Sequence, residues 1–377
     1  MAEPAEKVFF TTMTRSNDSP ETGNVEALRK VFVAMSGGVD SSVAAYLLRK
    51  DGYMVTGATM CLGVPDEQGR AACCGPQAVR DAREICDRLE IPHYVLDFST
   101  QLYNDVVRDF VESYARGRTP NPCVRCNQYL KFTSLYNYAR SCGYDAIATG
   151  HYTRTGIHEG ATVLMRHRDQ KKDQSYFLYS IPATVLERVL FPLENLEKNA
   201  VRDLARTAGL PVAEKKESQE ICFIPDDDYR RFLREHGISD DPGPMVDTSG
   251  KVLGKHRGIS NYTIGQRKGL GIATGSPRYV VALRRKENTV IIGGKEDLLC
   301  SSLTARDINL YVDHLPERCT AKVRYTQTDV PCEVRREHDR LTVNFPDPVE
   351  AVTPGQSVVL YLGDVVLGGG IIDDDDE

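Results

Sequence analysis

The sequence predicts an α/β fold with a doubly wound parallel sheet, followed by a small β-rich domain and a C-terminal β-barrel. A buried apolar strand runs directly into a glycine- and serine-rich loop and a helix. Strands and helices then alternate through the first half of the chain, and short strands separated by turns follow. The chain has 377 residues, more than one ordinary hydrophobic core holds, so two or three domains are expected.

The alternation of strands and helices is inferred from apolar runs and helical faces. Strands are expected at 31–35, 54–60, 93–98 and 146–150, and helices at 41–49, 77–89, 102–116, 129–142 and 200–208. This order predicts right-handed crossovers between parallel strands, with ligands bound at the carboxyl ends of the strands.

Turn signals such as Asp241-Pro242-Gly243-Pro244 replace the helices after about residue 220. Short strands, typical of small β-domains, are expected at 278–283, 289–292, 321–325, 341–345 and 357–362. The predicted divisions are a disordered tail at 1–28, the α/β domain at 29–220, the central β-rich domain at 221–295, the barrel at 296–372 and an acidic tail at 373–377.

Composition is typical of a soluble globular protein and leaves nucleic-acid binding open. No apolar run approaches the roughly 18 residues of a membrane span, and the polar N-terminus has no feature of a signal or transit peptide, so we expect a cytoplasmic location. Of the formal net charge of −6, the run Asp373–Glu377 contributes −5 and residues 1–24 contribute −2, which leaves +1 for the rest. A near-neutral body can carry a local basic patch for phosphates.

A phosphate-binding loop is predicted where the first strand meets the first helix. The motif SGGVDSS, Ser36 to Ser42, lets backbone N–H groups form a concave nest at a helix N-terminus. Asp40 could hold a magnesium ion that bridges phosphates. An N-capped helix after a glycine turn is the simpler alternative, but it explains only one serine and one glycine.

The loop differs from the GxxxxGK[ST] pattern and resembles the PP-loop of ATP pyrophosphatases. That superfamily cleaves ATP between the α- and β-phosphates and passes AMP to an oxygen. The resemblance therefore implies ATP and Mg²⁺ but leaves the acceptor open.

Cysteines supply the second set of motifs. Thr119 to Asn127, TPNPCVRCN, contains Cys123 and Cys126 at CxxC spacing, and its two prolines predict a rigid loop rather than a helix. Ser218 to Ile224, SQEICFI, places Cys222 at the edge of the α/β domain. Eleven cysteines in a cytoplasmic chain suggest metal, redox or nucleophilic roles for some of them.

Eight motifs occur in one order: SGGVDSS, TPNPCVRCN, IATGHY, KDQSYFL, QEICFI, YTIGQRKGLGI, RYTQTD and TPGQSVVLY. From about residue 30 to 372 the chain resembles the MnmA family of tRNA-specific 2-thiouridylases. The resemblance implies 2-thiolation of the wobble uridine (U34), driven by adenylation of its C2 oxygen. It also implies two partners, the anticodon stem-loop of tRNA and a sulfur-carrier protein or cysteine desulfurase.

The same resemblance assigns the sulfur chemistry. Cys222 carries sulfur as a persulfide, and Cys126 is the nucleophile that attacks Cys222 and leaves a disulfide. Both react as thiolates, so nearby cations are expected to help, and Arg125 and Lys131 are close in sequence.

An iron–sulfur mechanism stays open at this point. Cys123, Cys126 and Cys222 could hold three irons of a [4Fe–4S] cluster whose fourth iron binds sulfide. A structural zinc would want four ligands. More distant alternatives are a PP-loop amide-forming ligase, which needs no paired cysteines, and an RNA-binding module without catalysis.

The resemblance also implies which residues contact ATP and RNA. Asn121, Pro122 and Cys123 face the target base, which must leave its stack for chemistry. The remaining tRNA contacts are expected at His151, Lys172, Asp173, Gln174, Arg324, Tyr325 and Gln356. The ATP contacts are expected at Ala34, Met35, Ser36, Gly37, Gly38, Val39, Asp40, Ser41, Met60 and Gly150.

Overall fold

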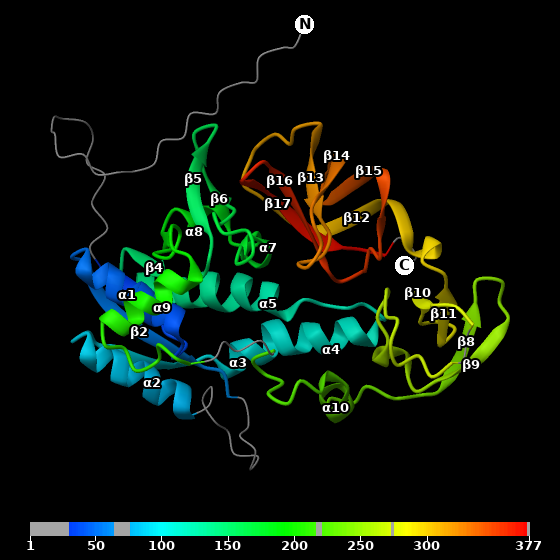
Figure 1. Cartoon of the computed structure of the whole chain (residues 1–377), viewed down its shortest axis with the longest axis horizontal. Coiled ribbons are helices and arrows are strands. Elements are labelled where there is room, and N and C mark those ends of the chain that lie inside the picture. The colour runs from blue at the N-terminus through cyan, green and yellow to red at the C-terminus, as the bar shows by residue number, and fades with distance from the viewer. Residues whose placement is uncertain (1–29, 64–75, 216–220, 273–274, 375–377) are drawn as a thin grey trace, which may run out of the picture.

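A computed structural model describes residues 30–63, 76–215, 221–272 and 275–374, and within these ranges the strands form three sheets (Figure 1). The first sheet is parallel and has the order β3-β2-β1-β4-β7. Its strands are β1 (Lys30–Ala34), β2 (Met54–Cys61), β3 (His93–Asp97), β4 (Ala146–Ala148) and β7 (Val189–Leu190). The order reverses between β1 and β4, which confirms the predicted doubly wound fold.

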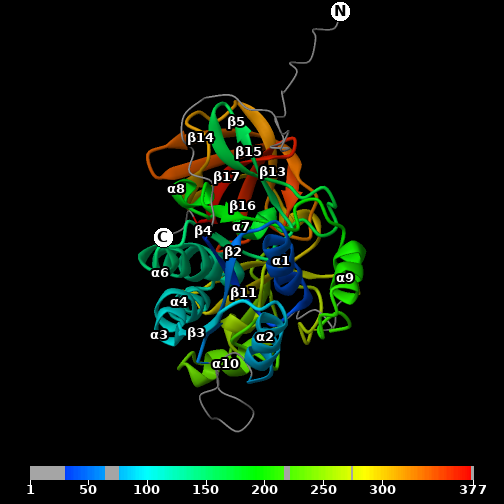
Figure 2. The ribbon, with the colours of Figure 1, turned by 90° about the vertical axis from the view of Figure 1, so that its left-hand side faces the viewer.

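Side chains of β1 alternate between two apolar layers, because successive residues of a strand point to opposite faces. Val31 and Val33 pack into the core under α1 (Val39–Lys50), α2 (Pro76–Arg88) and α9 (Lys198–Thr207). Phe32 packs into the opposite core, with residues of α6 (Leu135–Ser141). Figure 2 shows α1 and α2 on one side of the sheet and α6 on the other.

The CxxC motif lies on a helix, which corrects the predicted rigid loop. A continuous helical run consists of α5 (Pro122–Arg125), the π-helix η2 (Cys126–Ser134) and α6. Pro122 is tolerated at the first helical position because no N–H is needed there. Asn121 caps the helix, since its side chain accepts a hydrogen bond from the N–H of Val124 at 3.4 Å.

The run before the motif is also helical, through α3 (Ser99–Leu102), the π-helix η1 (Tyr103–Val107) and α4 (Arg108–Ala115). Residues of η1, α4 and η2 share a small core with Phe223, Ile224 and the helix α10 (Tyr229–Glu235). This core fixes the segment that follows Cys222 against the helices that carry Cys126.

The second sheet is central and has the order β10-β11-β8-β9. Its core contains Met245, Val280, Val290 and Ile292. Its strands are β8 (Gly243–Asp247), β9 (Val252–His256), β10 (Tyr279–Arg284) and β11 (Thr289–Gly293), and the short helices η3 (Ile259–Asn261) and η4 (Glu296–Leu298) lie in and after this region.

The third sheet contains a closed barrel of six strands, β12-β15-β14-β13-β16-β17, in which β12 also pairs with β17. The strands are β12 (Leu299–Leu310), β13 (Arg318–Lys322), β14 (Val330–Glu337), β15 (Arg340–Glu350), β16 (Ser357–Leu362) and β17 (Val365–Ile372). The strand predicted at 321–325 therefore lies three residues earlier, and residues 323–329 form the following turn.

A hairpin of the α/β domain extends the barrel sheet, and the sequence prediction missed it. Strands β5 (Arg154–His158) and β6 (Ala161–Met165) join β17 through the pair Val365 and Met165. Glu159 and Gly160 form its two-residue turn with positive φ values of 49° and 82°, the geometry of a type I′ turn. The helices α7 (Ser175–Leu178) and α8 (Ala183–Leu186) follow.

One hydrophobic core runs from the α/β domain into the barrel. Phe32 and Tyr176 of the first domain belong to the same buried cluster as Val358 and Tyr361 of β16. Among the described helices, none is both long and apolar enough to cross a membrane.

Candidate active site

The predicted phosphate loop connects β1 to α1 at the carboxyl edge of the sheet. Gly37 has φ +67°, and a Cβ atom there would lie 2.4 Å from the carbonyl oxygen of Ala78, so both its conformation and its surroundings require glycine. Gly38 caps α1, and its carbonyl oxygen accepts hydrogen bonds from the hydroxyls of Ser41 at 3.2 Å and Ser42 at 2.7 Å. The first turn of α1 keeps N–H groups without an intrahelical acceptor, which suits an anion.

Asp40 is held by two side chains that no sequence motif indicated as partners. Its carboxylate accepts a hydrogen bond from the Tyr152 hydroxyl at 2.7 Å, and both oxygens lie 2.7 Å from Lys198 Nζ. The Asp40 side chain is 29% exposed, against 11% for Lys198. A partly exposed carboxylate beside a phosphate loop fits the oxygen ligands that Mg²⁺ prefers.

Gly150 lies against the loop, after the end of β4. A Cβ atom at this position would lie 2.6 Å from the carbonyl carbon of Asp40 and from the backbone nitrogen of Ser41. The end of β4 therefore touches the backbone where a phosphate is predicted to bind.

The other predicted ATP contacts differ in how they can act. Met35 and Val39 are buried in the core under α1, so only their backbone can face a nucleotide. Ala34 and Met60 are half-buried and pack against the opposite core.

Lys215 is a second lysine at this loop that the sequence prediction missed. Its Nζ donates to the carbonyl oxygen of Gly37 at 2.9 Å and to Asp81 at 2.6 Å. The end of the α/β domain is thereby tied to the phosphate loop and to α2. Neither Lys215 nor Lys198 lies in a recognisable motif.

Cys126 and Cys222 lie together although they are far apart in sequence. Cys126 begins η2 and is buried, and the side chain of Cys222 lies close enough for the two thiols to shift each other's pKa. The next residue after Cys222, Phe223, packs edge-on against Phe110 with ring centroids 5.5 Å apart. The small core described above therefore brings the two predicted sulfur-transfer cysteines into contact.

The two thiols differ in acidity. The interaction with the Cys222 thiol lowers the pKa of Cys126; burial opposes this shift and the charge of Lys131 adds to it. The same contact raises the pKa of Cys222, and burial raises it further. Cys126 is therefore the thiol that more readily becomes the nucleophilic thiolate.

The cation at the cysteines is Lys131 and not Arg125. The Arg125 guanidinium turns to Asp307 at 2.6 Å and Asp109 at 3.4 Å. Lys131 Nζ instead donates to Asn127 Oδ1 at 2.9 Å and lies 3.5 Å from His151 Nε2.

His151 is a neutral imidazole beside this lysine. Burial, and then the charge of Lys131, lower its pKa well below the ordinary value of 6.5. Because Lys131 is a donor, Nε2 accepts, and Nδ1 carries the proton that is donated to Thr149 Oγ1 at 2.8 Å.

Asp173 and Gln174, which were predicted to contact tRNA, are held by internal hydrogen bonds. Asp173 is only 5% exposed, and its carboxylate accepts from the N–H of His167 and from both the N–H and the hydroxyl of Ser175. Gln174 Oε1 accepts from the N–H of Tyr152 at 2.8 Å. Lys172, next to them, is half-buried.

Arg324 and Gln356 bridge segments of the chain. Arg324 donates to the carbonyl oxygen of Ile264 at 2.8 Å. Gln356 Nε2 donates to the carbonyl oxygen of Thr119 at 2.8 Å. Tyr325 is 36% exposed, and its ring centroid lies 4.5 Å from that of Phe177.

Family models match almost the whole described chain. Residues 29–226 match the model described as tRNA methyl transferase HUP domain, residues 230–294 the tRNA methyl transferase PRC-barrel domain, and residues 300–372 the Aminomethyltransferase beta-barrel domain. The first match alone covers more than half of the chain. These matched segments are not domain boundaries, so the domain bounds given from the sequence remain predictions.

The alignments with curated relatives span nearly the whole length of this chain and of each relative. The tRNA-specific 2-thiouridylase MnmA 1 of Syntrophus aciditrophicus (strain SB) is 50% identical over 358 residues, which are 94% of this chain and 96% of the relative. The MnmA of Carboxydothermus hydrogenoformans is 49% identical over 356 residues, 92% of this chain and 98% of the relative. The chain belongs to the MnmA family.

Solved structures add little to this assignment of the MnmA-family chain. A 4-thiouridine synthetase in complex with RNA and bound ATP aligns with a TM-score of 0.36 and 16% identity, covering 55% of this chain and 50% of that one. A likeness at this level carries no conclusion about function.

Cys123, Cys126 and Cys222 are the residues that an iron–sulfur cluster would need in this MnmA-family chain. Within the described residues, no group of three or more His, Cys, Asp or Glu side chains could hold a metal ion. The cluster alternative therefore has no support in the structure.

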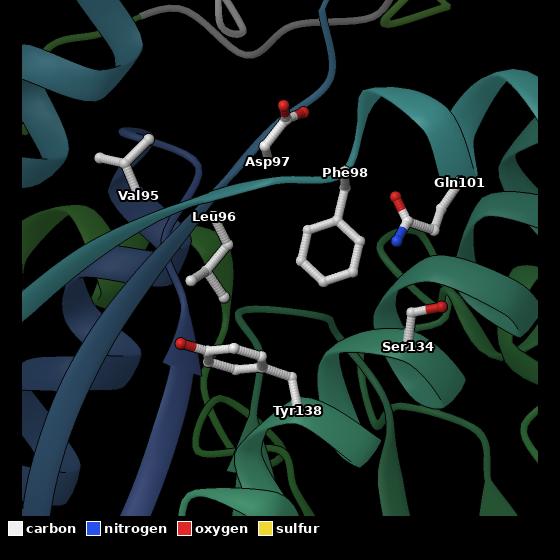
Figure 3. Close-up of a pocket in the computed structure, with 7 residues that line it drawn as sticks. All are labelled: Val95, Leu96, Asp97, Phe98, Gln101, Ser134 and Tyr138. Carbon is white, nitrogen blue, oxygen red and sulfur yellow. The ribbon is translucent and has the colours of Figure 1, made fainter.

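A cavity of about 340 Å³ lies apart from the residues discussed so far (Figure 3). Leu96, Phe98 and Tyr138 converge on it from the end of β3 and from α6. Its wall contains none of the predicted ATP, tRNA or cysteine residues.

Proposed function

We propose that this chain is an ATP-dependent tRNA uridine 2-sulfurtransferase that converts the C2 carbonyl of U34 to a thiocarbonyl. The pairing of Cys126 with Cys222, which are far apart in sequence but interact in the structure, carries the proposal, because ATP-dependent ligases without sulfur chemistry do not need two such cysteines. The curated relatives are named tRNA-specific 2-thiouridylases, which supports tRNA uridine as the substrate.

ATP activates the uridine oxygen in the first step. The C2 oxygen attacks the α-phosphorus, an adenylated uridine forms, and pyrophosphate leaves. The backbone of the loop from Ser36 to Ser42 holds the phosphates. Asp40 would hold the Mg²⁺ ion, which neutralises phosphate charge when bound.

Sulfur then replaces the activated oxygen. The terminal sulfur of a Cys222 persulfide attacks C2 and forms a C2–S bond, while the C2–O bond breaks and AMP leaves with the oxygen. The Cys126 thiolate attacks Cys222 Sγ, so a Cys126–Cys222 disulfide forms and the sulfur stays on the base as the leaving thiolate. A dithiol reductant must restore both cysteines before another turnover.

RNA recognition and sulfur supply complete the proposal. Asn121, Pro122 and Cys123 at the start of α5 face the flipped base, and His151, Lys172, Arg324 and Tyr325 belong to the surrounding tRNA surface together with Asp173, Gln174 and Gln356. The persulfide comes from a sulfur-carrier protein or cysteine desulfurase. A cytoplasmic location, where tRNA and ATP meet, is part of the proposal.

Replacing each sulfur-transfer cysteine by serine tests this function. We expect Cys126→Ser and Cys222→Ser each to lower thiolation of a U34-containing tRNA by more than about 100-fold. Pyrophosphate release in a single turnover should continue, because adenylation precedes the sulfur step. Thiolation is read as retarded migration in a mercury-containing gel, and pyrophosphate with labelled ATP.

Cys142→Ser is the matched control, because Cys142 is an exposed cysteine on the far end of α6. It should thiolate tRNA like the unchanged protein. Thiolation retained by Cys222→Ser would refute the persulfide role of that residue.

A further inference from the structure

The π-helical backbone of η2 determines which side chains lie on the same side of the helix as Cys126. In an α-helix, residues five apart point roughly 140° away from each other, given 3.6 residues per turn. In η2 the helical bonds instead join residues five apart, as in the bond from the N–H of Leu135 to the carbonyl oxygen of Leu130. Cys126 and Lys131 are five residues apart, so the π-helical register brings Lys131 toward the side of the helix that carries the buried thiol.

Lys131 has polar partners but no acidic one in the described part of the chain. Its half-buried ammonium group contacts Asn127 Oδ1 and His151 Nε2. No Asp or Glu oxygen among the described residues lies within the 4.0 Å that defines an ion pair. The carboxylates of Asp109 and Asp307 bind Arg125.

Among the described residues, the other groups that titrate around Lys131 are His151, which is neutral, and the thiols of Cys123, Cys126 and Cys222. A half-buried cation is costly unless an anion faces it. The anions that the proposed sulfur transfer creates here are the Cys126 thiolate and the Cys222 persulfide.

The ammonium group is held in place from both sides. Asn127, which accepts from Lys131, is 2% exposed and donates its own amide to the carbonyl oxygen of Phe177 at 2.8 Å. His151 is fixed by Thr149. A fixed charge stabilises an anion without the cost of reorienting side chains or water.

We propose that Lys131 is the positioning residue for sulfur transfer, which holds the attacking sulfur of Cys126 as an anion aimed at Cys222. The inference rests on the proposed function for the identity of the transfer step. Its effect on the Cys126 thiolate, however, exists in the free protein and can be measured without tRNA.

Alkylation of Cys126 by iodoacetamide is the first readout, followed from pH 5 to pH 9 by mass spectrometry of the Cys126 peptide. We expect Lys131→Met to slow alkylation at pH 7 about tenfold and to shift its pH profile upward by about one unit. Lys131→Arg keeps the charge and should stay within about threefold of the unchanged protein. Lys50→Met, at an exposed lysine at the end of α1, should leave the profile unchanged.

An unchanged profile in Lys131→Met would overturn the inference. If that variant does not fold, as judged by circular dichroism, Lys131→Gln takes its place with the same expectation. A loss that Lys131→Arg fails to rescue would also overturn it, because a purely structural role would then explain the effect.

Single-turnover thiolation separates this inference from the proposed function. Lys131→Met should lose thiolation about tenfold and keep pyrophosphate release. If the unchanged protein does not thiolate tRNA but the alkylation profile shifts, the proposed function fails and the inference stands. If the unchanged protein thiolates and Lys131→Met does so equally fast, the inference fails.

Discussion

Asp40 depends on residues that the chain supplies much later. Its carboxylate is bound by Tyr152, after β4, and by Lys198, in the first turn of α9. Lys198 has the sequence context of any surface lysine on an amphipathic helix, so no local pattern predicts its ion pair. The SGGVDSS motif predicts the phosphate loop, whereas the packing of α9 against α1 brings the charge of Lys198 to Asp40 in that loop.

Adding a single methyl group at Gly150 tests whether ATP binds at the loop from Ser36 to Ser42. We expect Gly150→Ala to weaken binding of a non-hydrolysable ATP analogue about tenfold or more, because its methyl group would overlap the backbone of Asp40 and Ser41. Overpacking of this kind costs about 1–3 kcal/mol. Equilibrium dialysis measures the affinity.

Gly275→Ala is the control for this prediction. A Cβ atom at Gly275 meets nothing within 4 Å, and its φ is not in the left-handed region. It should bind the analogue normally. Normal binding by Gly150→Ala as well would mean that the nucleotide does not use this loop.

At the scale of one element, the start of the helix α5 follows from the residues at its first positions. Pro122 and Asn121 begin a helix because proline and an N-cap residue suit its first positions. The prediction of a rigid loop there was wrong, since it treated both prolines as breakers. The change to π-helical register at Cys126 has no sequence signal that we recognise.

The β5–β6 hairpin gives a prediction at the scale of one element. Glu159 has φ +49°, a conformation that asparagine tolerates better than most residues. We expect Glu159→Asn to raise the free energy of unfolding by about 0.5–1 kcal/mol, measured by urea denaturation. Glu159→Ala also removes the carboxylate, but alanine does not tolerate a positive φ as asparagine does, so this variant should not raise the free energy of unfolding. An equal rise in both variants would mean that the backbone conformation at residue 159 is not the cause.

At the scale of the whole molecule, the barrel holds the segment before the CxxC motif. The N–H of Thr119 donates to the carbonyl oxygen of Pro354 at 2.8 Å, and Gln356 binds the carbonyl oxygen of Thr119. Arg118 pairs with Asp373 at 2.9 Å. The chain that enters α5 is therefore positioned by residues from the opposite end of the sequence.

Gln356→Ala distinguishes positioning from RNA contact. If Gln356 mainly holds the Thr119 segment, kcat for thiolation should fall about tenfold while the Kd for tRNA stays within about twofold. Filter binding and steady-state rates measure the two quantities. Asn344→Ala, at an exposed amide on β15, should change neither; a weaker Kd with unchanged kcat would instead support the tRNA contact predicted from the sequence.

Prediction from the sequence succeeded where apolar pattern and turn chemistry are local. The strand at 357–362 and the helices around α1 and α2 lie where their periodicity places them. The hairpin at Glu159 and Gly160 was missed because neither strand alternates apolar and polar residues, so the glycine turn was its main local signal. The contacts of Lys198 with Asp40, of Lys215 with Gly37 and of Gln356 with Thr119 had no local sequence signal. Each joins residues that meet only through long-range packing.

The amino-acid order alone was sufficient to indicate the phosphate loop, the two cysteines of the proposed sulfur transfer and the family, because each depends on residues that are close together or on motifs in a fixed order. Which thiol is the more acidic, and which cation faces it, depends on distances between separate elements. Phe223 and Ile224 dock Cys222 beside Cys126, and the π-helical register brings Lys131 to the same place. Electrostatic interactions weaken with distance and with exposure to water, so these properties exist only once the chain has folded.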